Sequence, residues 1–177
     1  ITELTGLEIA NASLLDEGNA CSEALFMAYQ SQRKKRNKIL ICNDLFDASK
    51  AVIKSRFKYL DIEIIESDFE TIQVDDSFAA VIGQFPAKNG ELNDYSTIFK
   101  TCKTHNITPI ISADLLALTL FKSPKEMNAD IAVGSAQRFG IPLGFGGPSA
   151  AYIACTDEFK RLLPGRIIGL SKDRHDK

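Results

Sequence analysis

Short apolar runs alternate along the chain with stretches of helical periodicity, and this pattern predicts the secondary structure. Six of the apolar runs are too short to be independent helices and are typical of buried strands. They span 38–42, 62–65, 78–82, 109–113, 131–133 and 150–154. Apolar strands of this kind belong to parallel sheets whose connecting helices cover both faces. The expected fold is therefore α/β, with a mainly parallel sheet and helices on both faces.

Helical periodicity predicts three main helices between these strands. The first spans about residues 14–32 and follows a polar turn at 7–18, in which Asn11, Ser13 or Asp16 can cap it. Residues 83–90 have the composition of a loop, and 157–162 that of a short helix. The second helix is expected to begin at Asn43, with one face formed by Ala48, Val52, Ser55 and Tyr59. The third is expected to begin at Asn93, with one face formed by Tyr95, Ile98, Phe99 and Cys102.

A glycine-rich segment separates the last two predicted strands. Glycine is favoured where the backbone needs a positive φ or approaches another group closely, and proline restricts φ at both ends of the segment. This composition predicts a shaped surface, either a ligand wall or a subunit seam, and the alternative is a tight turn between two core strands. The residues concerned are Gly140, Pro142, Gly144, Gly146, Gly147 and Pro148.

Two charged residues close to the predicted strand ends are candidates for chemistry. Ligands of such sheets bind outside the carboxyl ends of the strands. Asp114 directly follows an apolar strand and precedes an apolar run, so its charge requires a cationic partner or a ligand nitrogen, unless it caps a helix. Arg138 can bind a carboxylate or phosphate, or serve as a structural ion-pair partner, and Arg166 offers the same two possibilities.

Composition and charge exclude several classes of protein. With 177 residues, 45% of them hydrophobic and 25% charged, the chain fits one globular domain of ordinary size. The net charge of −2 creates no field that attracts nucleic acid or an anionic membrane. The basic run 33–36 is expected to be a solvated helix terminus. No apolar run approaches the ~20 residues that cross a bilayer.

Common catalytic and metal-binding motifs are absent from the sequence. The four cysteines are widely spaced within apolar stretches and the chain has two histidines, so buried reduced thiols are expected and a zinc site is not. No dinucleotide fingerprint, P-loop or nucleophile elbow is present. An independent phosphate- or nucleotide-binding domain using 144–147 remains an alternative. The chain begins at Ile1 and ends on a polar stretch, so 1–177 is expected to be a single α/β domain, a truncated large domain of a longer polypeptide.

Four blocks of the sequence closely resemble the glycine cleavage system P-protein family, glycine dehydrogenase (decarboxylating). They are 4–17, 113–119, 133–148 and 164–173, and the most specific element is Ser-Ala-Gln-Arg-Phe-Gly at 135–140. The resemblance covers nearly the whole chain in order. It identifies the chain as similar to part of the amino-terminal half of the long P-protein, or to subunit 1 of the split form.

This resemblance implies the fold of aspartate-aminotransferase-like (fold type I) pyridoxal phosphate enzymes, with a mainly parallel seven-stranded sheet. In that family only the carboxy-terminal half carries the Schiff-base lysine, and Gln137 stands at the lysine's position here. A glutamine amide cannot condense with an aldehyde, so no catalytic residue is expected in this chain. The implied vestigial cofactor site comprises Asn11, Ser13, Asp114, Gln137, Arg138, Gly144, Gly146 and Gly147.

For the complete enzyme, the resemblance implies pyridoxal-phosphate-dependent decarboxylation of glycine and transfer of the aminomethyl group to the lipoyl arm of H-protein. The chain would serve as scaffold and interface, with the cofactor bound by the lysine-bearing half or subunit. Its compartment would be the mitochondrial matrix or the bacterial cytoplasm. A non-catalytic α/β module that only binds partners is the alternative function.

Overall fold

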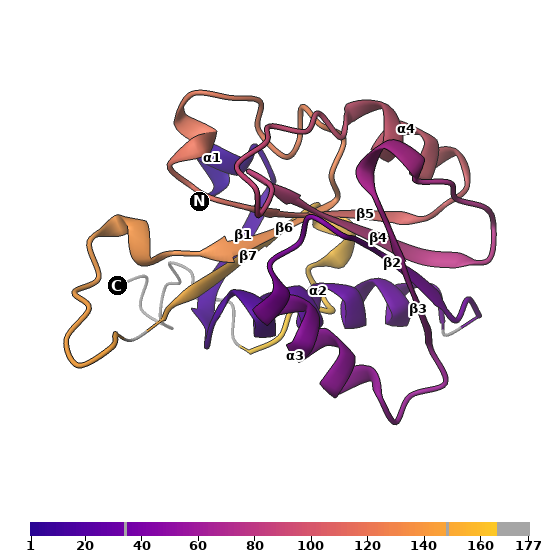
Figure 1. The fold of residues 1–177 in the computed structure, drawn as a ribbon, viewed down its shortest axis with the longest axis horizontal. Coiled ribbons are helices and arrows are strands. Elements are labelled where there is room, and N and C mark those ends of the chain that lie inside the picture. Colours follow the sequence, from indigo (N-terminus) through magenta and orange to yellow (C-terminus); the bar gives the residue numbers. More distant parts are fainter. Residues whose placement is uncertain (34, 148, 166–177) are drawn as a thin grey trace, which may run out of the picture.

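A seven-stranded sheet organises the protein (Figure 1). The computed structural model describes residues 1–33, 35–147 and 149–165. The strand order is β1-β7-β6-β5-β4-β2-β3. The strands are β1 (Ile9–Leu14), β2 (Lys38–Cys42), β3 (Glu63–Ser67), β4 (Phe78–Phe85), β5 (Thr108–Ala113), β6 (Ile131–Ser135) and β7 (Ala151–Cys155). The mainly parallel sheet expected from the apolar runs is thereby confirmed.

Parallel pairing runs through the sheet from β3 to β6, and the direction changes at β7. Strand β2 is parallel to β3 and β4, β4 is parallel to β5, and β5 is parallel to β6. Strand β7 is antiparallel to both of its neighbours, β6 and β1. The glycine-rich segment therefore links β6 to β7 as a long hairpin loop, which extends away from the sheet in Figure 1.

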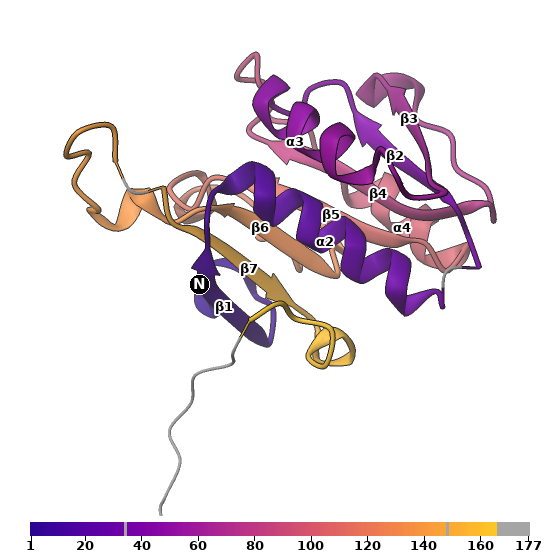
Figure 2. The same ribbon diagram turned by 90° about the horizontal axis from the view of Figure 1, so that it is seen from below.

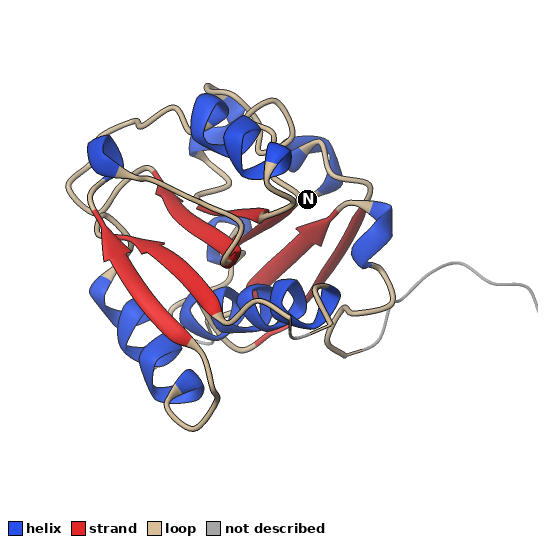
Figure 3. Ribbon diagram, turned by 90° about the vertical axis from the view of Figure 1, so that its right-hand side faces the viewer, coloured by secondary structure: helices blue, strands red, loops and turns tan. Residues whose placement is uncertain are grey.

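Helices cover both faces of the sheet (Figures 2 and 3). Helices α2 (Glu17–Ser31) and α3 (Asp47–Phe57) pack side by side on one face. The short α1 (Thr2–Thr5) and α4 (Ser96–Thr104) lie on the other. Successive side chains of a strand point to opposite faces, so Ile39 and Ile41 join the core under α2 while Leu40 and Cys42 join the core under α4.

The predicted polar turn at 7–18 is wrong for most of its length, because residues Ile9–Leu14 form the edge strand β1. This segment mixes small polar and apolar residues, so it lacks the apolar run that identified the other strands. Its pairing partner is 142 residues away along the chain, with Asn11 opposite Ile153 in β7. Of the suggested helix caps, Asp16 is the N-cap residue: its Oδ1 accepts a hydrogen bond from the Asn19 backbone N–H at 2.7 Å.

Two further boundaries differ from the sequence prediction. Strand β4 continues to Phe85, so Gly83 and Gln84 belong to a buried strand and not to a loop. Helix α3 begins at Asp47 and buries Ser49, Ile53 and Phe57, while Tyr59 lies beyond its end and is 86% exposed. The predicted face is therefore displaced by one residue, and the Asp44 carboxylate binds the Tyr95 hydroxyl and does not cap this helix.

The buried face of α4 and the state of the cysteines agree with the sequence prediction, although α4 begins at Ser96 and not at Asn93. Tyr95, Phe99 and Cys102 are fully buried, and the Tyr95 and Phe99 rings stack at 5.1 Å. The Asp44 carboxylate accepts from the Tyr95 hydroxyl at 2.9 Å. All four cysteines are free and buried. No helix in the described part of the chain is both long and apolar enough to cross a membrane.

Candidate functional site

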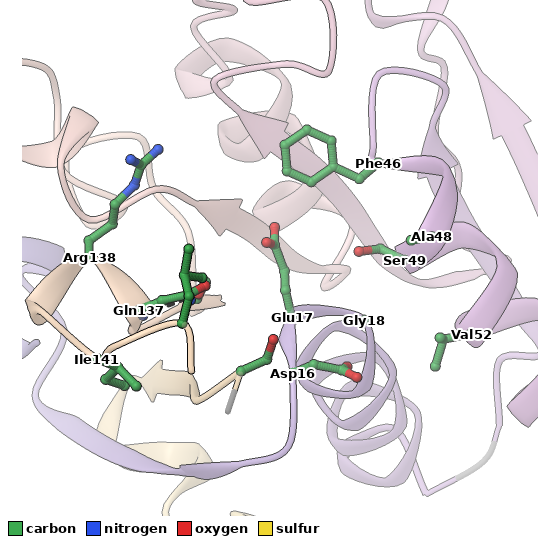
Figure 4. Close-up of a pocket in the computed structure, with 13 residues that line it drawn as sticks. Asp16, Glu17, Gly18, Phe46, Ala48, Ser49, Val52, Gln137, Arg138 and Ile141 are labelled. Atoms are coloured by element: carbon green, nitrogen blue, oxygen red, sulfur yellow. Dashed lines mark hydrogen bonds between the residues drawn. The ribbon is translucent and has the colours of Figure 1, made fainter. Parts of the chain in front are cut away.

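Two adjoining cavities lie where the carboxyl ends of β4, β5 and β6 face the start of α2. Figure 4 shows the larger of the two. The larger has a volume of about 720 Å³ and the smaller about 220 Å³. Both are lined by Glu17, Phe46, Ser135 and Arg138. The larger cavity extends towards Gln137 and Leu143, and the smaller towards Gln84 and Asp114. This is the edge at which a parallel sheet places its ligands.

Two carboxylates occupy the amino terminus of α2. Asp16 is the N-cap residue, and its Oδ1 accepts from the Asn19 backbone N–H and side-chain amide at 2.7 and 2.9 Å. Glu17 Oε1 accepts from Ser112 Oγ at 2.6 Å and from Gln84 Nε2 at 3.2 Å. The start of a helix stabilises negative charge, and here the chain's own acids take that place.

Asp114 and Arg138 pair with each other across the smaller cavity. Arg138 Nε donates to Asp114 Oδ1 at 3.2 Å, and Arg138 Nη2 donates to Asp114 Oδ2 at 3.0 Å. Asp114 Oδ1 also accepts from the Leu116 backbone N–H at 3.1 Å, before the short 3-10 turn Ala117–Thr119. The cationic partner expected for Asp114 is therefore Arg138, and the same carboxylate also stabilises the start of a turn.

Gln137 lies two residues beyond the end of β6 and begins the short 3-10 turn Gln137–Phe139, from which its side chain lines the larger cavity. The segment beyond it requires glycine, since Gly144, Gly146 and Gly147 have φ of 50°, 110° and 92°. A Cβ on Gly147 would lie 3.5 Å from Gln137 Nε2, so this end of the loop returns to the cavity wall. Gly144 and Gly146 have open space around them.

Not every predicted site residue reaches the cavities. Asn11 is buried in β1, where its Nδ2 donates to the Pro164 carbonyl at 2.7 Å, and neither cavity includes it among its described lining residues. The side chain of Ser13 lies outside the described residues, as do Pro148 and Arg166. The structure brings together Asp114, Gln137 and Arg138.

Sequence reasoning missed three residues of the site: Glu17, Gln84 and Ser112. Glu17 falls at the end of a stretch assigned to a turn, and Gln84 was assigned to a loop. A signal for Gln84 existed, because it is a polar residue inside an apolar run and is 1% exposed. Ser112 is a fully buried polar residue in β5, and its position next to Glu17 depends on the packing of α2 against the sheet.

Groups behind the cavity stay protonated. Burial, followed by the charge of Glu17, raises the pKa of the Cys21 thiol to about 12. Burial raises the pKa of the Tyr152 hydroxyl well above its usual value, and Glu17 and Asp114 add to the effect. Tyr152 donates its hydroxyl hydrogen to the Ala113 carbonyl at 2.8 Å. Cys21 is thus no thiolate nucleophile at neutral pH, and Tyr152 has a structural role.

Known protein sequences are similar to this chain over its full length. A family profile described as "Glycine cleavage system P-protein" matches residues 1–177. Glycine dehydrogenase (decarboxylating) of Nostoc sp. (strain PCC 7120) is 48% identical over 177 residues, which is 100% of this chain and 18% of that relative. The mitochondrial glycine dehydrogenase (decarboxylating) of Flaveria anomala is 43% identical over 100% of this chain and 17% of its own length. The chain thus spans less than a fifth of these relatives.

Solved structures agree with the sequence comparison. Glycine decarboxylase (P-protein) of the glycine cleavage system, solved in an inhibitor-bound form, superposes with a TM-score of 0.93 at 30% identity, covering 99% of this chain and 41% of that one. A protein of Campylobacter jejuni whose structure contains N'-pyridoxyl-lysine-5'-monophosphate shares the fold, with a TM-score of 0.69 at 17% identity over 93% of this chain and 40% of that one. By its family match, its identity to these relatives and its fold, the chain belongs to the glycine cleavage system P-protein family.

Proposed function

We propose that this chain is part of the glycine decarboxylase of the glycine cleavage system and serves there as scaffold and interface, without a covalently bound cofactor. The reaction of the complete enzyme would be the pyridoxal-phosphate-dependent decarboxylation of glycine, with transfer of the aminomethyl group to the lipoyl group of H-protein. Relatives named glycine dehydrogenase (decarboxylating), similar over this entire chain, support the proposal. Because the chain covers 18% of such a relative, it would be a truncated part of the large domain.

The residues around the cavities do not fit pyridoxal phosphate. Gln137 has no basic amine that could form an imine. Arg138 neutralises the charge of Asp114 through two hydrogen bonds, so this carboxylate offers no uncompensated charge to a pyridinium nitrogen. Asp16 and Glu17 place negative charge at the start of α2, where a phosphate would otherwise bind. The observation that carries the proposal is the Asp114–Arg138 pair beside Gln137. Gln137 offers no amine for covalent attachment of the cofactor, and the paired Asp114 offers no free charge to its ring.

Borohydride reduction of the full-length enzyme tests where the cofactor is held. Reduction in the presence of pyridoxal phosphate converts an imine into a stable adduct, and peptide mapping by mass spectrometry then locates it. We expect a stoichiometric adduct on a lysine outside residues 1–177. A stoichiometric adduct on any lysine of this chain would contradict the proposal, and omission of borohydride is the control.

The hairpin loop between β6 and β7 supports an interface with the lysine-bearing half or subunit. Phe139, Leu143 and Phe145 are exposed on this loop, and Phe145 has its whole side chain in solvent. Large apolar side chains gathered on one projecting segment mark a protein–protein contact. A scaffold should bind the lysine-bearing half and ignore H-protein in a pull-down experiment. Binding of H-protein alone would instead favour the alternative of an independent partner-binding module.

The compartment is proposed from the relatives. Similar proteins come both from bacteria and from mitochondria. The proposed locations are accordingly the bacterial cytoplasm or the mitochondrial matrix. Subcellular fractionation of the source cells, with immunodetection of the full-length protein, distinguishes these from any membrane-bound location.

A further inference from the structure

One buried polar atom at the site has no partner within the described residues. Gln84 is 1% exposed, and its Oε1 accepts no hydrogen bond there. The orientation of the amide follows from its other end, because Nε2 donates to Glu17 Oε1 at 3.2 Å. Turning the amide over would bring its oxygen against the carboxylate. Buried polar groups in folded proteins are nearly always hydrogen-bonded, so Gln84 Oε1 calls for a donor.

The space next to Gln84 is the smaller cavity, of about 220 Å³. Glu17, Gln84 and Asp114 supply acceptor oxygens to its wall, and the Ser135 hydroxyl, which also lines it, accepts from the Gln137 backbone N–H. Glu17 and Asp114 are carboxylates, and Arg138 pairs with only one of them, Asp114. The remaining charge, on Glu17, is held by the neutral donors Ser112 and Gln84. The cavity therefore favours a donor that carries positive charge.

Apart from Ser135 and Arg138, the rest of the lining is apolar and limits the size of the ligand. Phe46, Pro86, Ala87 and Ala113 form the other walls. They suit a short alkyl chain attached to a charged head. A metal ion is disfavoured, because the described residues contain no group of three or more His, Cys, Asp or Glu side chains placed to hold one. A phosphate or carboxylate ligand would face Glu17 directly.

We propose that this cavity binds a primary ammonium group, held by Glu17, Gln84 Oε1 and Asp114. An ammonium group has three N–H donors and no acceptor, which matches the three acceptors, and a charge-assisted bond to Glu17 stabilises it further. The group belongs either to a small free amine or to a lysine side chain from another part of the full-length protein. The site is separate from the proposed scaffold function and does not depend on it.

Crystals of the full-length protein, soaked in propylammonium chloride, test the proposal directly. Tetramethylammonium chloride at the same concentration is the control, because it carries the same charge without an N–H donor. We expect either a propylammonium molecule with its nitrogen within hydrogen-bond distance of Gln84 Oε1 and Glu17, or a lysine Nζ at that position in untreated crystals. The first result identifies a free amine and the second a lysine. Water alone in the cavity in all crystals would overturn the proposal.

Calorimetry on variants of the full-length protein gives a second measurement for a free amine. Glu17→Gln keeps the shape of the side chain and removes its charge, and should raise the Kd for propylammonium about 10-fold or more. Glu23→Gln is the matched control, since Glu23 lies on the same helix and pairs with Arg56 away from the cavity. Propylammonium that binds elsewhere on the protein would bind equally to both variants, so a difference in Kd between them reports on this cavity. If Glu17→Gln fails to fold, Gln84→Met, which removes the unpartnered acceptor together with the Nε2 donor to Glu17, should also weaken binding. An unchanged Kd in a folded Glu17→Gln or Gln84→Met variant contradicts the proposal.

Discussion

Gly134 in β6 is the position at which a single methyl group should disturb the site most. A Cβ on Gly134 would lie 2.3 Å from the Ala113 carbonyl oxygen and 2.9 Å from Tyr152 Cε1. The first distance is about 1 Å shorter than an ordinary contact, and its partner is backbone, which cannot swing aside. Strand β6 would have to move away from β5, and Ser135, Gln137 and Arg138 would move with it.

The expected cost of Gly134→Ala follows from two effects. Overpacking of a dense core costs about 1–3 kcal/mol. Displacing the Tyr152 ring also weakens its 2.8 Å hydrogen bond to Ala113, which adds about 1 kcal/mol. The free energy of unfolding should therefore fall by roughly 2–4 kcal/mol, measured as a shift of the urea midpoint at unchanged slope.

Gly18→Ala is the matched control for this prediction. Its Cβ would meet Val52 Cγ2 at 3.1 Å, Val52 Cβ at 3.3 Å and Ser49 Cα at 3.4 Å, and each of these distances is longer than the 2.3 Å at Gly134. Alanine is favoured over glycine within a helix by about 1 kcal/mol, which offsets the tight contact. Gly134→Ala with a stability equal to wild type, or to Gly18→Ala, would refute the account of β6 packing.

Three other predictions concern the thiols, an ion pair and the exposed loop. Burial raises the pKa of all four cysteine thiols to about 12, those of Cys21, Cys42, Cys102 and Cys155. A thiol reagent at pH 8 should therefore label them only after unfolding, and rapid labelling of the native protein would contradict this burial. Lys122 is the main cause that lowers the pKa of Asp94 from 3.8 to about 2. The stability from this pair is present above pH 3.8 and is lost as pH falls through about 2. Asp94→Asn should thus lower the urea midpoint more at pH 7 than at pH 2, and an equal loss at both would exclude the charge effect. Phe145→Ser should leave the thermal midpoint unchanged and weaken capture by the lysine-bearing half about 10-fold, whereas unchanged capture would exclude this loop as the contact.

Strand positions could be predicted from the sequence where the signal is local. Strands β2, β5, β6 and β7 were expected within one or two residues of their observed bounds, since each is a continuous apolar run. Strand β1 was missed, because its residues are small and partly polar and it is defined by pairing with β7 at the far end of the chain. The face of α3 was displaced by one residue, because apolar spacing alone allowed both choices.

The site was predictable only in part, because its contacts join residues that are far apart in the sequence. Asp114 and Arg138 were each expected to have an ionic partner, since a charge beside apolar runs requires one, but nothing in their spacing of 24 residues showed that they pair with each other. Glu17 and Ser112 are 95 residues apart and form a hydrogen bond of 2.6 Å. No periodic signal connects such positions.

By itself, the sequence determined the α/β class, the apolar strands, the buried thiols and the absence of a basic amine at Gln137, because these depend on local composition and on the chemistry of single side chains. Tertiary structure alone decided that Arg138 neutralises Asp114, that Glu17 occupies the start of α2, and that Gln84, which lines a cavity, buries its Oε1 without a described partner. The physical reason is that these contacts form between strand ends and a helix terminus that packing brings together, and packing sums many weak contacts from the whole chain.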